Sequence, residues 1–260
     1  MLTVSNAFRE KVLNSPSFLE WQYKVKAGSN EYTSEVIKDL SITGQLQSQF
    51  TLGSSLSKSL ELELLVNERT ELPPLITVEV ILFNRVYEEE DGVLVEKIIS
   101  EPPLLVGSFY VTEIDRTTYG KLKIKAIDMM GHTDYFSSSV DAEIFHVNIT
   151  TVYEVIDAIS YDFNVKYNPY YDINLPKEDR INLFPISMED RYKEWPLTNF
   201  NNIALNFSYR QLLEYMAGLC GCNVKLNNRI VKVNDADVIA NEIEFFRFKD
   251  TNETLDGDNY

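Results

Sequence analysis

Residues 60–66 of the chain are Leu-Glu-Leu-Glu-Leu-Leu-Val, and this stretch decides the fold class. Side chains along a β-strand point alternately to opposite faces, so the leucines predict a buried face and the glutamates a solvated face. Six further strand candidates precede residue 130: 21–27, 36–44, 75–86, 93–99, 104–114 and 120–127. The stretches between these candidates show no helical spacing of apolar residues. Consecutive strands of this kind favour an antiparallel β-barrel or β-sandwich.

The pattern changes after residue 131. Apolar residues recur with helical spacing in 151–159, which predicts a helix there. Thr150 or Thr151, followed by Glu154, resembles a capping box at the start of this helix. The second half of the chain is therefore expected to be α+β rather than purely β.

A second helix is expected at 208–219, with Ser208 as its N-cap. Its apolar face should pack on the following hairpin and consists of Leu212, Leu213, Met216 and Leu219. Within 223–233, the pair Asn227-Asn228 predicts the tight turn of that hairpin.

The composition limits what the chain can do. It has 24 basic and 40 acidic side chains, and a net charge of −16 is unsuited to holding nucleic acid through its phosphates. The same charge suits a surface that DNA passes without sticking. Hydrophobic residues make up 44% of the chain, which is enough for a globular core. No segment approaches the roughly 18 apolar residues of a membrane-spanning helix.

The sequence has no arrangement that is typical of an enzyme or a metal site. It lacks a nucleophile elbow, a His-Glu-x-x-His helix and a glycine-rich phosphate loop. A structural zinc site needs four ligands, and Cys220 and Cys222 could be joined only by His132 and His146 from another region. We therefore predict a protein that is not an enzyme, with no metal and no cofactor, and interpret both cysteines as reduced thiols.

Three stretches, in this order, resemble one protein family. The first is 42–44 followed by 50–64, the second is 106–113 followed by 123–130, and the third is 207–221 followed by a hairpin. They are similar to segments of bacteriophage tail hub or tail-associated proteins, which form the tail tip or the hub of a baseplate. The resemblance covers roughly residues 35–235.

This resemblance implies a structural protein of the virion, assembled in the host cytoplasm. Family members form a trimeric ring, and each subunit supplies two barrel-like domains, so that three subunits imitate a sixfold tube. The expected function is to close the distal end of the tail tube and connect it to neighbouring proteins for host attachment and DNA ejection. The implied partners are two further copies of the chain, the distal tail protein, the tape-measure protein and receptor-binding or fibre proteins. DNA would pass through without specific binding.

The expected fold is thus mainly β, with an N-terminal antiparallel β-barrel-like tube domain followed by a smaller α+β domain. This expectation divides the chain into four segments: a helix or arm at 1–20, the tube domain at 21–135, an α+β hub region at 136–250 and an acidic tail at 251–260. The hub region would be an incomplete second barrel, so the sequence is either part of a longer protein or a shortened relative.

Two groups of residues are candidates for function. Acidic residues that could line the lumen of the tube are Glu61, Glu63 and Glu79. Aromatic residues that could form contacts between subunits are Tyr167, Tyr170, Tyr171, Tyr192, Trp195 and Phe200. Two alternatives remain open: a distal tail protein of the same assembly, and a carbohydrate-binding module whose aromatic rings recognise the host cell wall.

Overall fold

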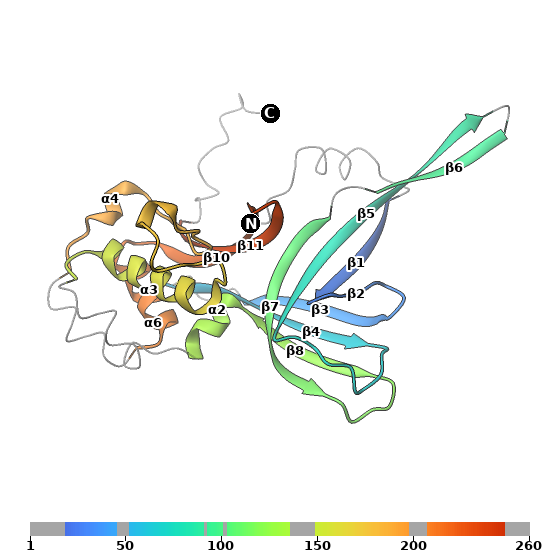
Figure 1. The fold of residues 1–260 in the computed structure, drawn as a ribbon, viewed down its shortest axis with the longest axis horizontal. Helices are drawn as coiled ribbons and strands as arrows, with labels where there is room; N and C mark the ends of the chain where they lie inside the picture. Colours follow the sequence, from blue (N-terminus) through green and yellow to red (C-terminus); the bar gives the residue numbers. More distant parts are fainter. Residues whose placement is uncertain are drawn as a thin grey trace. The chain divides into compact units, whose positions relative to one another are not determined.

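The chain is described by a computed structural model, drawn in Figure 1, and most of its ordered elements are β-strands. The structure describes residues 19–45, 52–90, 93–100, 103–135, 149–197 and 207–247. The predicted acidic tail and all but the last two residues of the predicted N-terminal arm lie outside these ranges. Contacts divide the chain into two units: the first takes its described residues from 1–45, 57–132 and 227–241, and the second from 46–56, 133–226 and 242–260.

The first unit is built on an antiparallel sheet. Eight of its strands are β1 (Leu19–Ala27), β2 (Asn30–Tyr32), β3 (Ile37–Gln45), β4 (Ser55–Leu64), β5 (Leu75–Glu90), β6 (Val93–Ser100), β7 (Leu104–Asp115) and β8 (Leu122–Asp128). They pair in the order β2-β1-β5-β7-β8-β4-β3, and β6 pairs with β5. All seven strands expected before residue 130 are confirmed, whereas β2 was not predicted.

The sheet of the first unit is open. Among the described residues, no strand pair joins β3 at one end of the order to β2 at the other. A closed barrel is therefore not shown, and the confirmed part of the fold prediction is a mainly β protein with a few helices. The difference arises because alternation predicts strands and their buried faces, but does not specify which strands pair at the edges of a sheet.

The alternation of β4 produces the core of the first unit. Leu60, Leu62 and Leu64 are buried, whereas Glu61 between them is exposed, as the sequence predicts. Residues from five strands complete the cluster: Val25, Ala27, Tyr32, Ile76, Val78, Phe109, Leu122, Ile124 and Ala126. Each fully buried leucine of this kind contributes about 1.5–3 kcal/mol relative to an exposed one.

The second unit combines helices with short strand pairs. Its elements are η1 (Thr133–Tyr135), α3 (Val152–Tyr167), η2 (Lys177–Asp179), β9 (Ile186–Ser187), α4 (Asp190–Lys193) and α6 (Tyr209–Leu219). Both expected helices are confirmed, and α3 runs eight residues beyond its predicted end. The two helices pack against each other through aromatic side chains, with the Phe163 and Tyr209 ring centroids 5.6 Å apart.

The turn predicted at Asn227-Asn228 is wrong. One continuous strand, β10 (Asn223–Val233), covers it, and the turn lies at Asn234 and Asp235 before β11 (Ala236–Phe246). Both turn residues have positive φ, which asparagine and aspartate tolerate well. Asn228 instead lies within the strand: its side-chain oxygen accepts from the Ser108 N–H, and its amide donates to Asn241. Its polar groups are thereby used in the sheet rather than in a turn.

The start of α3 gives a first testable prediction. Thr151 accepts a hydrogen bond from the Glu154 N–H, and the Glu154 carboxylate accepts from the N–H groups of Thr150 and Thr151. Thr151→Ala removes the cap and should lower the free energy of unfolding by about 1 kcal/mol. Urea denaturation measures this change. Thr118→Ala in an exposed turn is the control and should change stability by less than about 0.5 kcal/mol.

The same cap predicts a pH dependence. Hydrogen bonds from the Thr150 and Thr151 N–H groups lower the pKa of Glu154 below its ordinary value of 4.5. A lowered pKa in the folded state means that this stabilisation is complete above pH 4.5 and is lost as the pH falls through the lowered pKa. The destabilisation caused by Glu154→Gln should therefore be smaller at about pH 3 than at about pH 7, because the carboxylate that it removes is partly protonated at the lower pH. An equal loss at both values would contradict the role of the charged carboxylate.

Candidate functional site

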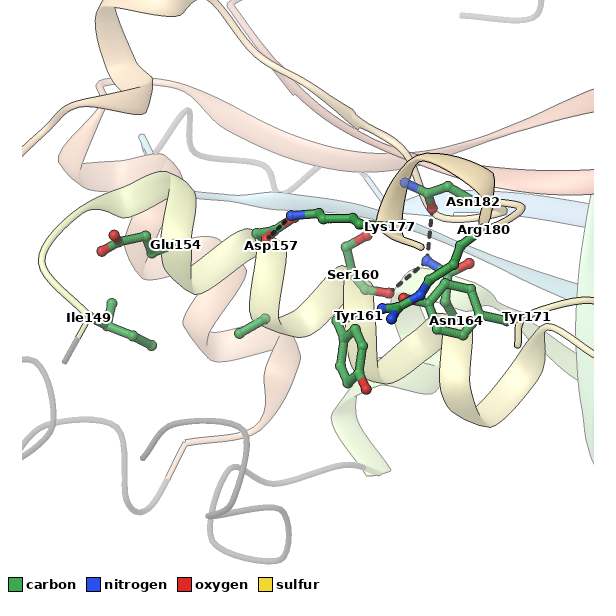
Figure 2. Close-up of a pocket in the computed structure, with 11 residues that line it drawn as sticks. Ile149, Glu154, Asp157, Ser160, Tyr161, Asn164, Tyr171, Lys177, Arg180 and Asn182 are labelled. Atoms are coloured by element: carbon green, nitrogen blue, oxygen red, sulfur yellow. Dashed lines mark hydrogen bonds and ion pairs between the residues drawn. The ribbon is translucent and has the colours of Figure 1, made fainter. Parts of the chain in front are cut away.

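A cavity of about 630 Å³ lies along one face of α3. The helix contributes side chains spaced at three- and four-residue intervals, including Glu154, Asp157, Tyr161 and Asn164, which therefore share one face. Between Glu154 and Asn164 the helix rises roughly 15 Å, so the cavity is elongated along the helix axis. Figure 2 shows these side chains on the same side of α3.

The opposite wall is the segment that follows α3. It supplies Tyr171, Lys177, Arg180 and Asn182 to the cavity. Arg180 holds this segment in shape, because its guanidinium donates to the backbone oxygens of Leu175 at 2.8 Å and Ile173 at 2.7 Å. The same guanidinium lies 5.8 Å from the centre of the Tyr171 ring.

Asparagine side chains attach this wall to the helix. Asn164 donates to the side-chain oxygen of Asn182 at 2.7 Å and accepts from the Leu183 N–H at 2.9 Å. Asn168 donates to the backbone oxygen of Ile181 at 2.7 Å. Because these groups are buried or partly buried and bonded, they hold the wall in one position without a ligand.

The charges in the cavity are balanced. Glu154 and Asp157 carry the negative charges, and Lys177 and Arg180 carry the positive ones. Glu154 is engaged in the helix cap and Arg180 with backbone oxygens, whereas Lys177 and Asp157 form an exposed pair at 3.5 Å. An exposed pair of this length contributes little to stability, so both partners are available to a ligand.

The predicted aromatic residues do not form one site. Tyr171 lines the cavity, and the exposed Tyr170 and half-buried Tyr167 are near it in sequence but do not line it. Tyr192 is buried, and the guanidinium groups of Arg191 and Arg247 lie 4.6 Å and 5.3 Å from the centre of its ring. Trp195, which follows α4, is 44% exposed. Phe200 lies outside the described residues.

The three predicted acidic residues have different surroundings. Glu61 is exposed on the face of β4 opposite the core. Glu63 lies on that same face, where hydrogen bonds from Lys38 at 2.9 Å and then Lys121 hold its pKa below the ordinary value. Glu79 is only 6% exposed and pairs with Lys26 at 2.9 Å, so it has almost no surface to present to a channel.

The two cysteines are buried free thiols at the end of α6. Burial raises the pKa of Cys220 to about 11, so this thiol stays protonated at neutral pH. Cys222 donates to the backbone oxygen of Cys220. Within the part of the chain that the structure describes, no three His, Cys, Asp or Glu side chains cluster as a metal site would require.

Most residues of the cavity were not predicted from the sequence. Tyr171 was among the candidate aromatic residues, but Asp157 and Tyr161 on the preceding helix were not predicted to lie near it. A usable signal was present, because Glu154, Asp157 and Tyr161 recur at helical spacing on the side of the predicted helix opposite its apolar residues. The turn-rich segment that forms the second wall gave no comparable signal.

Comparisons of this chain with protein families, with curated proteins and with solved structures find no match. Among the described residues, none of the helices combines the length and the apolar character needed to cross a membrane.

Proposed function

We propose that this chain is a structural component of a phage tail tip or baseplate hub, and that it acts without catalysing a reaction. It would close the distal end of the tail tube and connect it to neighbouring tail proteins. One observation carries this proposal: the three stretches that resemble the tail hub family are neighbours around β4. β4 pairs with β3, with β8 and with β10.

The first two stretches supply adjacent strands of the first unit. β4 and β8 are antiparallel neighbours with Leu60 opposite Ala126, and β7 pairs with the other edge of β8. Asp128, at the end of the second stretch, accepts hydrogen bonds from the Lys58 N–H at 2.8 Å and the Ser57 hydroxyl at 3.1 Å. Residues that are about 70 positions apart in the sequence are thus joined by specific bonds.

The third stretch meets the start of the first within the second unit. Ser55 pairs with Val224 in a parallel arrangement. The Ser55 hydroxyl accepts from the Arg210 guanidinium at 2.8 Å and donates to the Glu214 carboxylate. The proposal takes this contiguity of the three stretches as its support for a common architecture.

In the proposed ring, the open sheet of the first unit would complete a tube together with other parts of the chain or with other copies. The face of this sheet that is opposite the core carries Glu61 and Glu63, and this face would line the lumen. Each glutamate is opposite a lysine of β8, with Glu61 across from Lys125 and Glu63 across from Lys123. On the other side of β8, Glu113 and Asp115 of β7 are opposite the same two lysines. These acidic side chains offset the lysines of this face, and DNA phosphates would therefore pass without being held.

The two alternative functions predict a different structure or a different assembly state. A distal tail protein would have a second block of β-strands, whereas the described part of the second unit contains α3 and α6. A carbohydrate-binding module would act as an isolated monomer and would form no ring at the tail tip. The proposed function therefore depends on assembly, and the particle itself is the material for the test.

We expect an antibody raised against residues 52–135 to label one end of the virion tail in negative-stain electron microscopy. Cryo-electron microscopy of that tip should then resolve a ring of three copies, with Glu61 and Glu63 facing the channel. Labelling of the capsid or of the tail shaft would reject the proposed location. A channel surface with net positive charge would reject the proposed orientation of the sheet.

A further inference from the structure

We infer that the cavity along α3 is a binding site for a short, uncharged oligosaccharide. This inference is independent of the proposed tail-tip function, because it concerns the second unit alone and applies to the isolated chain. It rests on the shape of the cavity, the balance of its charges, the hydrogen-bonding groups left available, and an exposed tyrosine ring.

The shape selects an extended ligand. The cavity follows α3 for roughly 15 Å, from Glu154 to Asn164, and its volume of about 630 Å³ is within the ordinary range for a small-molecule site. A single small ion or one sugar ring would occupy only part of it. Its second wall is already fixed by Arg180 and by the asparagines of α3, so little order has to be created on binding.

The charges exclude strongly charged ligands. A polyanion would meet Asp157, and a polycation would meet Lys177. Because the two pair with each other at 3.5 Å, the cavity favours an uncharged ligand with many polar groups. A sugar hydroxyl both donates and accepts hydrogen bonds, and it can therefore use the carboxylate and the ammonium of this pair together.

Asn182 adds a further donor. Its side-chain oxygen already accepts from the Asn164 amide at 2.7 Å and from the Phe184 N–H at 2.9 Å. The N–H₂ group of this exposed residue lies in the same amide plane, on the opposite side of the Cγ atom from the oxygen, and can donate to a ligand. Asp157, Lys177 and Asn182 thus supply an acceptor and donors from residues that line the cavity, and Figure 2 marks the ion pair between Asp157 and Lys177.

The aromatic side chains supply the apolar part of the site. The Tyr161 and Tyr171 rings are nearly perpendicular, with centroids 5.9 Å apart, and Tyr161 is 40% exposed. The negative face of an aromatic ring attracts the polarised C–H groups on one face of a sugar ring. A peptide would find fewer backbone partners near the cavity, because the backbone oxygens of Ile173 and Leu175 in the segment after α3 are already bonded to Arg180.

The test titrates the full 260-residue chain with three uncharged trisaccharides: maltotriose, cellotriose and tri-N-acetylchitotriose. Isothermal titration calorimetry should detect binding of at least one of them with a dissociation constant of about 10 mM or lower, which allows for a weak complex. Tyr161→Ala and Asp157→Asn should each weaken that binding about tenfold, which is the effect of losing a ring contact or a charged acceptor. Tyr161 is 40% exposed and the Asp157 side chain is 41% exposed, and thermal melting confirms that the variants remain folded.

Tyr170→Ala is the matched control, because Tyr170 is 41% exposed and does not line the cavity. It should change the affinity by no more than about twofold, which is less than the change expected from losing a contact in the site. Tetra-alanine, which offers backbone amides without sugar hydroxyls, should not bind. The inference is overturned if no trisaccharide binds, if binding survives both cavity substitutions, or if tetra-alanine binds to the same site more tightly than the sugars.

Discussion

Leu213→Asp is expected to lower the free energy of unfolding of the second unit by about 4 kcal/mol or more. Leu213 is fully buried in α6, within a face that also includes Leu212 and Met216. Replacing a buried leucine by a small residue alone costs about 2–5 kcal/mol, and an unpaired carboxylate in the same place adds a desolvation penalty. Total stabilities are about 5–15 kcal/mol, so this variant should be largely unfolded under mild denaturing conditions.

Urea denaturation followed by circular dichroism measures the loss, and the fluorescence of Trp195 in a Trp21→Phe background gives a second signal from the second unit. Tyr215→Asp introduces the same charge two residues later, at a side chain that is 43% exposed. It should cost less than about 1 kcal/mol, because the carboxylate stays hydrated. Equal losses in the two variants would show that the charge, rather than burial in the core, is responsible.

Gly53→Ala is expected to cost about 2–4 kcal/mol, because strain and a steric conflict act together at this position. Gly53 has φ +85°, and a Cβ added there would lie 2.7 Å from the backbone oxygen of Glu214 in α6. Moving away would disturb the hydrogen bond from the Gly53 N–H to the Cys222 oxygen at 2.8 Å. The change in urea midpoint at constant slope measures the effect.

Two further alanine variants separate the causes. Gly120 also has positive φ, but a Cβ there would meet nothing within 4 Å, so Gly120→Ala measures the backbone strain alone. Gly218 lies on the helix side of the contact, where an added Cβ would be 3.6 Å from the Gly53 Cα. Gly218→Ala should be neutral or stabilising by up to about 1 kcal/mol, because alanine favours the helix. If Gly53→Ala costs no more than Gly120→Ala, the close approach of α6 is not important for stability.

The sequence by itself determined the local elements. Alternation in 60–66 identified β4 and its buried face, because the period of a strand depends only on the strand itself. Ser208 at the start of α6, and the pairing of Thr151 with Glu154 at the start of α3, were predicted for the same reason, since a cap and its partner are three residues apart.

Only the tertiary structure decided how these elements are joined. Two features depend on partners that are distant in the sequence: the pairing of Ser55 with Val224 and the open edges of the first sheet. The position of the β10–β11 turn depends on backbone angles that several residues of this stretch could adopt. The cavity along α3 has the same origin. Its helical wall follows a regular spacing, but its second wall exists because Arg180 and the asparagines fix an irregular segment through bonds to backbone groups. No local periodicity encodes such bonds, and for that reason the site became visible only in the folded chain.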